Sequence, residues 1–99
     1  MEMPETNCNA ALQAIAHGLV QGVNYRAFVL EKAHQLDLTG FARNLPTFED
    51  VEIIAEGKKE NLEKLIIYLR QGPRYARVDG VTVTWTEPGN EFKSFVIKY

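Results

Sequence analysis

Two glycines and an arginine stand close together where an apolar run gives way to a helical pattern. Gly18 and Gly22 are four positions apart, and Arg26 follows in the first turn of the expected helix. Glycine lets the backbone curl without a Cβ clash, so this loop can turn several N–H groups into one concavity. Such amides at the start of a helix attract an anion, and arginine adds a planar fork of donors that matches phosphate oxygens. The segment therefore predicts an anion-binding loop, with an ordinary strand–helix turn and a surface arginine as the alternative.

The glycine spacing does not fit two common nucleotide-binding loops. No Gly-Lys-Ser/Thr follows the glycines, as a Walker A loop requires, and the G-x-G-x-x-G pattern of dinucleotide-binding folds is missing. His17 directly precedes the loop and His34 lies within the expected helix. A lone histidine is more often structural or exposed than catalytic, so we expect neither of them to take part in chemistry.

Hydrophobic periodicity predicts the elements that must position this loop. The expected elements are strands over residues 10–20, 41–44, 51–56, 81–86 and 95–99, and helices over residues 25–37 and 60–71. On the first helix, Tyr25, Val29 and Ala33 fall on one apolar stripe. In the third strand, Glu52 and Glu56 alternate with apolar residues, so we expect that strand to bury mostly one side.

The order of these elements is β-α-β-β-α-β with a final strand, which is typical of a ferredoxin-like α/β sandwich of the α+β class. Two helices should pack on one face of an antiparallel sheet. The chain has 99 residues, the size of one domain. We expect residues 1–9 to form a disordered tail and residues 10–99 to form the domain. The fold class alone does not determine a function.

Composition argues against several classes of function. The net charge is −2 and the isoelectric point about 5.6, whereas nucleic-acid binders usually carry a basic excess. Cys8 is the only cysteine, so no intrachain disulfide can form, and no Cys/His spacing resembles a zinc site. No stretch approaches the roughly 20 apolar residues of a membrane-spanning helix, and the first residues do not read as a signal peptide. We expect a cytoplasmic protein that binds neither nucleic acid nor membrane.

Several motifs resemble those of the acylphosphatase family. Residues 18–26, GLVQGVNYR, resemble the signature G-x-V-Q-G-V-x-[FY]-R, and residues 38–44, LTGFARN, are similar to the family's L-x-G-[W/F]-V-[R/K]-N. Residues 51–57 and 95–99 resemble two further conserved segments. The first motif is specific, and its combination with the second at the expected separation is strong.

The resemblance implies an enzyme that hydrolyses acyl phosphates to a carboxylate and inorganic phosphate. It implies that Arg26 holds the phosphoryl group and that Asn44 positions the attacking water. The backbone amides expected to cradle the phosphate oxygens belong to Gln21, Gly22, Val23, Asn24, Tyr25 and Arg26, with Gly18 shaping the loop. It implies no metal, no other cofactor and no phosphoenzyme. We further expect a monomer that phosphate, the product, inhibits.

The chemistry of the substrate agrees with these residue types. The leaving group is a carboxylate, whose acid has a pKa of about 4 by analogy with aspartate and glutamate, and it leaves without a general acid. Phosphoryl transfer depends mainly on positioning and charge stabilisation, which an arginine, loop amides and a neutral asparagine can supply.

Two other functions remain open. Residues 40–43 faintly resemble the RNP1 segment of an RNA-binding domain on the same fold, although the alternating aromatics that stack on bases are missing. The chain could also be a catalytically silent regulatory module. Phosphate release and binding to single-stranded RNA at two salt concentrations would discriminate among the three.

Overall fold

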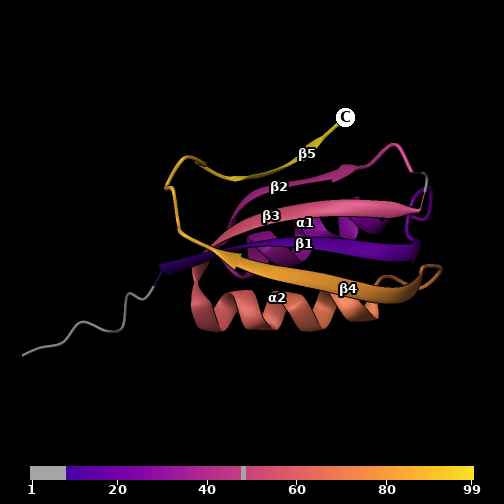
Figure 1. Cartoon of the computed structure of the whole chain (residues 1–99), viewed down its shortest axis with the longest axis horizontal. Coiled ribbons are helices and arrows are strands. Elements are labelled where there is room, and N and C mark those ends of the chain that lie inside the picture. Colours follow the sequence, from indigo (N-terminus) through magenta and orange to yellow (C-terminus); the bar gives the residue numbers. More distant parts are fainter. Residues whose placement is uncertain (1–8, 48) are drawn as a thin grey trace, which may run out of the picture.

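The computed structural model describes residues 9–47 and 49–99 of the chain. Its elements are β1 (Asn9–Leu19), α1 (Tyr25–Gln35), β2 (Thr39–Asn44), β3 (Asp50–Lys58), α2 (Lys59–Gln71), β4 (Arg77–Thr86) and β5 (Phe95–Lys98) (Figure 1). The predicted elements are all present, with ends that differ by a few residues. The predicted tail lies outside the described residues except for Asn9, which opens β1.

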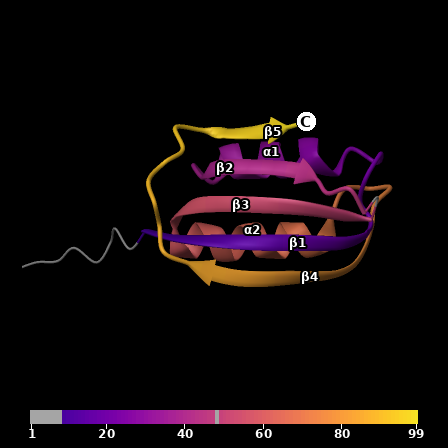
Figure 2. The ribbon, with the colours of Figure 1, turned by 45° about the horizontal axis from the view of Figure 1, so that its top comes forward.

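The strands form one sheet in the order β4-β1-β3-β2-β5. The first three neighbouring pairs are antiparallel, whereas β2 and β5 are parallel. The ferredoxin-like class is confirmed, but the sheet is mixed rather than wholly antiparallel. The reason is the connection after β4, which crosses one end of the sheet to the opposite edge, so β5 starts at the end where β2 starts (Figures 1 and 2).

Both helices cover the same face of the sheet, and the core lies between the helices and the sheet (Figure 2). The predicted stripe of α1 is buried at Tyr25, Val29 and Ala33. The sheet meets the helices largely through small or branched side chains, which allow a close approach. The buried residues of the strands and α2 include Leu12, Ala14, Ala16, Ala42, Val51, Ile53, Ala55, Leu62, Leu65 and Leu69. Burial of each leucine side chain contributes roughly 1.5–3 kcal/mol, so this layer stabilises the frame that carries the loop.

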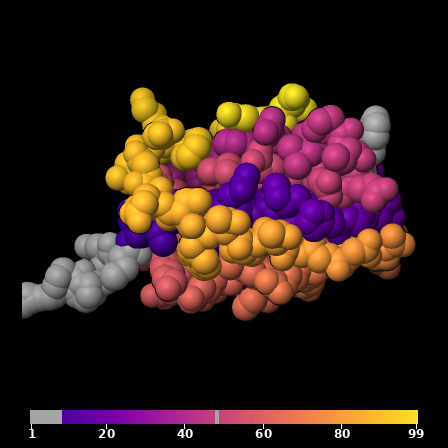
Figure 3. Space-filling view, in the orientation of Figure 1, coloured from indigo at the N-terminus to yellow at the C-terminus, as the bar shows by residue number. Residues whose placement is uncertain are grey.

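Strand side chains form most of the other face of the sheet, and the β4–β5 connection covers one end of it (Figure 3). The expectation that β3 buries mostly one side is wrong. Glu52 and Glu56 of β3 are only 8% and 5% exposed, so β3 buries both of its sides. Glu52 accepts hydrogen bonds from Arg43 Nε at 2.6 Å and Gln13 Nε2 at 2.7 Å. Both oxygens of Glu56 accept from the backbone N–H of Asn90 at 3.0 Å. The partners come from other strands and from the β4–β5 connection, which alternation within one strand does not reveal.

The charge on Glu52 is stabilised by its partners. Burial alone would raise the pKa of this carboxyl, but the hydrogen bonds from Arg43 and Gln13 outweigh burial and hold the pKa below its ordinary value of 4.5. Arg43 belongs to β2 and directly precedes Asn44. The ion pair therefore fixes β2 to β3 one residue before the side chain that is predicted to position water.

At the end of β1 the pairing with β4 is irregular: His17 pairs with Gly80 and Gly18 with Val78, so a β-bulge in β4 leaves Asp79 without a partner on β1. Gly18 has φ +128°, and a Cβ there would collide with the carbonyl oxygen of Arg77 and lie 2.8 Å from the nitrogen of Asp79. Its N–H donates to the carbonyl oxygen of Glu49 at 3.0 Å. Gly18 thus lets β1 bend closely past β4 just before the loop.

We expect Glu52→Ala to lower the free energy of unfolding at pH 7 by about 1–3 kcal/mol, because it leaves two donors without their charged acceptor. The folded-state pKa of Glu52 is depressed, so its contribution is fully present above pH 4.5 and is lost as the pH falls through the lower folded-state value. Urea unfolding of both proteins at neutral and acidic pH checks this. A stability difference that grows on acidification would contradict the assignment.

We expect Gly18→Ala to lower the free energy of unfolding by about 1–3 kcal/mol, because the site combines a positive φ with a collision against β4. Gly80→Ala is the matched control, since Gly80 also lies in the paired region of β1 and β4. A Cβ added at Gly80 would have no atom within 4 Å. The control should change stability by less than about 0.5 kcal/mol. Equal losses in the two variants, measured by thermal or urea unfolding, would show that the bulge does not need glycine.

Candidate functional site

The strand directions bring the predicted site residues to one end of the sheet. β1 and β2 end there and β3 begins there, because β3 is antiparallel to both. The loop at residues 20–24 therefore lies beside the turn that joins β2 to β3. Gln21 makes this contact directly: its Nε2 donates to the carbonyl oxygens of Leu45 at 2.9 Å and Asp50 at 2.8 Å. Only the backbone of Gln21 was expected at the site, and its side chain has this additional role.

The loop has the conformation expected of an anion-binding turn. Gly22 has φ +75° and Asn24 has φ +68°, both in the left-handed region. Within the described part of the chain, the N–H groups of residues 21–24 have no hydrogen-bond partner. Asn24 is the N-cap of α1 and makes no side-chain cap hydrogen bond. The loop thus leaves a run of amide donors next to the positive end of a helix.

Tyr25 fixes the start of that helix. Its side chain points into the core and its hydroxyl donates to the carbonyl oxygen of Leu69 in α2 at 2.8 Å. Burial raises the pKa of Tyr25, so the hydroxyl remains a neutral donor. Only the backbone of Tyr25 is therefore available to the loop, and this is the part of the residue that the sequence analysis assigned to the site.

Arg26 lies at a pocket of about 240 Å³ that the start of α1 shares with β5. The lining residues are Val20, Gly22, Asn24, Tyr25, Arg26, Ala27, Ile97 and Tyr99. Arg26 Nη1 donates to the carbonyl oxygen of Lys98 at 3.2 Å, and its guanidinium carbon lies 4.9 Å from the centre of the Tyr99 ring. Ile97 and Tyr99 were not expected at the site, because the β2–β5 pairing brings this end of the chain next to the loop.

Asn44 ends β2 at the same end of the sheet. Its Oδ1 is buried and has no hydrogen-bond partner among the described residues. A buried amide oxygen without a partner costs roughly 1–3 kcal/mol of stability, so a hydrogen bond from a polar ligand or water to this oxygen would be favourable. Asn44 does not line the 240 Å³ pocket itself. Asn44 directly follows Arg43, which pairs with Lys98 of β5. The carbonyl oxygen of Lys98 accepts the hydrogen bond from Arg26. The β2–β5 register therefore places Asn44 next to the position where Arg26 is anchored.

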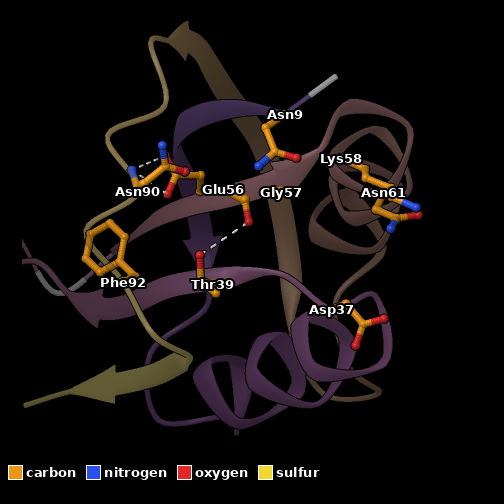
Figure 4. A pocket seen from close by; sticks show the side chains of 9 residues that line it. All are labelled: Asn9, Asp37, Thr39, Glu56, Gly57, Lys58, Asn61, Asn90 and Phe92. Carbon is orange, nitrogen blue, oxygen red and sulfur yellow. Dashed lines mark hydrogen bonds between the residues drawn. The ribbon is translucent and has the colours of Figure 1, made fainter. Parts of the chain in front are cut away.

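A larger cavity, of about 360 Å³, lies at the opposite end of the sheet (Figure 4). It is lined by the start of β2 and the ends of α1 and β3, with Thr39, Asp37 and Lys58 among its residues. Glu56 and Asn90 meet on one side of it (Figure 4). None of the site residues predicted from the sequence lines this cavity.

The two histidines make structural contacts. His17 Nδ1 lies 2.7 Å from Asp50 Oδ1, and His34 Nε2 lies 3.0 Å from the carbonyl oxygen of Phe95. In the described parts of the chain, no three His, Cys, Asp or Glu side chains gather as a metal site would require. Neither of the described helices is long and apolar enough to cross a membrane.

Known proteins are similar to this chain in both sequence and fold. A family model for acylphosphatases matches residues 12–97. The chain is 54% identical over 76 residues to an acylphosphatase of Thermus thermophilus, covering 77% of this chain and 85% of that protein. An acylphosphatase of Dehalococcoides mccartyi is 43% identical over 88 residues, which cover 89% of this chain and 97% of the relative. The crystal structure of acylphosphatase from Bacillus subtilis superposes with a TM-score of 0.87 at 30% identity, covering 91% of this chain and 99% of that one. The chain therefore belongs to the acylphosphatase family.

Proposed function

We propose that Arg26, the loop amides and Asn44 carry out the family's reaction in this chain. That reaction is the hydrolysis of the carboxyl–phosphate bond of an acyl phosphate to a carboxylate and inorganic phosphate. The observation that carries the proposal is the convergence at one sheet end of Arg26, the unpartnered amides of residues 21–24 and the buried oxygen of Asn44. Each of these groups suits a different part of the reaction.

Arg26 and the loop bind the phosphoryl group. Among the described residues, no carboxylate forms an ion pair with Arg26, so its charge is compensated only by a carbonyl oxygen and an aromatic ring. A phosphate dianion is a stronger partner than either, because charge-assisted hydrogen bonds are roughly twice as strong as neutral ones. The guanidinium fork and the amides of residues 21–26 then surround the phosphoryl oxygens and stabilise the charge of the transition state.

Asn44 orients the water. Its Oδ1, which is buried in the structure, turns toward the pocket on substrate binding, accepts a hydrogen bond from the water and directs the water's lone pair at phosphorus. The new bond forms between the water oxygen and phosphorus, while the bond from phosphorus to the acyl oxygen breaks and the carboxylate leaves with the electron pair. Both hydrogens of the water end on the phosphate product. Because water itself bonds to phosphorus, no phosphoenzyme forms.

The leaving group explains the substrate class. A carboxylate is stable as an anion, since its acid has a pKa of about 4. An alkoxide or phenoxide from a phosphate ester is a far more basic leaving group, and the residues assigned to the reaction include no general acid to protonate it. The same pocket should therefore act on acyl phosphates and poorly on esters.

The remaining parts of the proposal concern the state of the enzyme. We propose a monomer in the cytoplasm, inhibited by its product phosphate. The large exposed apolar side chains support a monomer because they are scattered over different elements, and include Leu19 of β1, Ile67 of α2 and Val96 of β5. Sedimentation equilibrium measures the mass directly.

We expect the enzyme to hydrolyse benzoyl phosphate at an undiminished rate in the presence of EDTA, because Arg26 and the loop amides supply the positive charge. Under the same conditions, phenyl phosphate should be hydrolysed at a rate near the blank, because its leaving group is more basic. Phosphate release is measured for both substrates. Loss of activity in EDTA that returns on adding Mg²⁺ or Zn²⁺ would contradict the metal-free mechanism.

We expect Arg26→Ala and Asn44→Ala each to lower kcat for benzoyl phosphate by at least about 10²-fold, the scale of losing one transition-state donor. The two should differ in binding. Arg26→Ala should also weaken competitive inhibition by phosphate, whereas Asn44→Ala should leave the phosphate inhibition constant almost unchanged, because Asn44 contacts the water.

The matched controls for these variants are Arg70→Ala, on the exposed side of α2, and Asn9→Ala, at the far end of β1. Both should keep wild-type rates. Near-normal rates in Arg26→Ala and Asn44→Ala would show that the site is elsewhere, even if the chain hydrolyses acyl phosphates.

A further inference from the structure

Asp50 is heavily hydrogen-bonded at the site end of the sheet. Its Oδ1 accepts from His17 Nδ1 at 2.7 Å, and its Oδ2 accepts from Thr47 Oγ1 at 2.7 Å. The hydrogen bonds from Thr47 and then His17 hold the pKa of Asp50 below its ordinary value of 3.8. The carboxylate is thus ionised at neutral pH and joins the end of β1 to the turn between β2 and β3.

The backbone of Asp50 makes two more contacts at the same point. Its carbonyl oxygen accepts from Leu45 N at 3.0 Å and from Gln21 Nε2 at 2.8 Å. The first bond closes the turn, and the second ties the turn to the loop at residues 20–24. Asp50 therefore links three segments that are separate in the sequence.

The turn that Asp50 closes begins directly after Asn44. Asn44 pairs with Val51, the neighbour of Asp50, so the two residues lie on adjacent positions of the β2–β3 ladder. Among the described residues, the Asn44 oxygen has no hydrogen-bond partner to fix its direction. The position of Asn44 therefore depends on the backbone on either side of it. On one side, Arg43 is held by its ion pair with Glu52; on the other side, the turn is held by its hydrogen bond to Asp50.

We infer that Asp50 is a positioning residue, which orients the Asn44 amide toward the water by fixing the β2–β3 turn between His17, Thr47 and the loop. The inference rests on the proposed function, because it assigns Asp50 a role only through Asn44. Asp50 itself does not touch the substrate. A displacement of about 1 Å in a positioned group can cost up to roughly 10²-fold in rate, which sets the scale of the effect.

The test measures kcat for benzoyl phosphate and the inhibition constant of inorganic phosphate in Asp50→Ala. We expect kcat to fall about 10- to 10²-fold. The phosphate inhibition constant should change by less than about threefold, since Arg26 and the loop amides remain. Asp79→Ala is the matched control: Asp79 is an exposed carboxylate of β4, paired with Arg77 at 3.1 Å, and its removal should leave kcat unchanged.

A double-mutant cycle separates positioning from general stabilisation. If Asp50 acts through Asn44, adding Asp50→Ala to Asn44→Ala should lower kcat no further than Asn44→Ala alone. A purely structural residue would cost the same factor in both backgrounds. Asp50→Asn should restore kcat to within about threefold of wild type, because its amide can still bond Thr47 and a neutral His17 imidazole.

Thr47→Ala provides a second variant should Asp50→Ala fail to fold, since it removes only the Oδ2 hydrogen bond. It should lower kcat less than Asp50→Ala and again only when Asn44 is present. Wild-type kcat in both Asp50→Ala and Thr47→Ala, or additive losses in the cycle, would overturn the inference. Wild-type kcat in Asn44→Ala would instead overturn the proposed function, so the two failures are distinguishable.

Discussion

The pairing of β3 with both β1 and β2 is the constraint on which the site depends. β3 lies between these strands and runs antiparallel to each, so the end of β1, the end of β2 and the start of β3 meet at one edge. The loop at residues 20–24 follows β1, Asn44 ends β2 and Asp50 begins β3. A slip of one residue in either ladder would reverse which face each side chain occupies, and the alanine-rich helix-facing layer disfavours such a slip. Packing of the core thus determines the geometry of the site.

The loop itself is locally unfavourable. Asn24 adopts a left-handed conformation, which costs most residues with a Cβ roughly 1–2 kcal/mol and asparagine less, and a run of amide donors lacks partners in the described structure. Contacts outside the loop offset this cost. Tyr25 is held by the carbonyl oxygen of Leu69, and Gln21 is held by the β2–β3 turn. The unfavourable conformation is therefore concentrated where an anion would be bound, as is common at functional sites.

The sequence predicted the parts of this arrangement that depend on local order. Periodicity indicated the strands and helices, and the glycines around residue 20 indicated the loop, because both signals reside in neighbouring residues. The burial of Glu52 and Glu56 could not be predicted from the sequence, because their partners come from other strands and from the β4–β5 connection. The place of Ile97 and Tyr99 could not be predicted either, because the parallel pairing of β5 with β2 brings the end of the chain to Arg26. The β4–β5 connection also affects the faint RNP1-like segment at residues 40–43. The ring of Phe41 packs against Phe92 of this connection at 5.9 Å between ring centres, which leaves Phe41 less free to stack on a base.

The wall that β5 contributes to the pocket has a consequence for how the enzyme is made. The hydrogen bond between Arg26 and Lys98 spans 72 positions of the chain. On a ribosome, the loop and the first helix emerge long before the strand that completes their pocket. Contacts so distant in sequence form late because closing a long loop is entropically costly. A nascent chain can therefore hold most of its core before the final strand docks and completes the pocket.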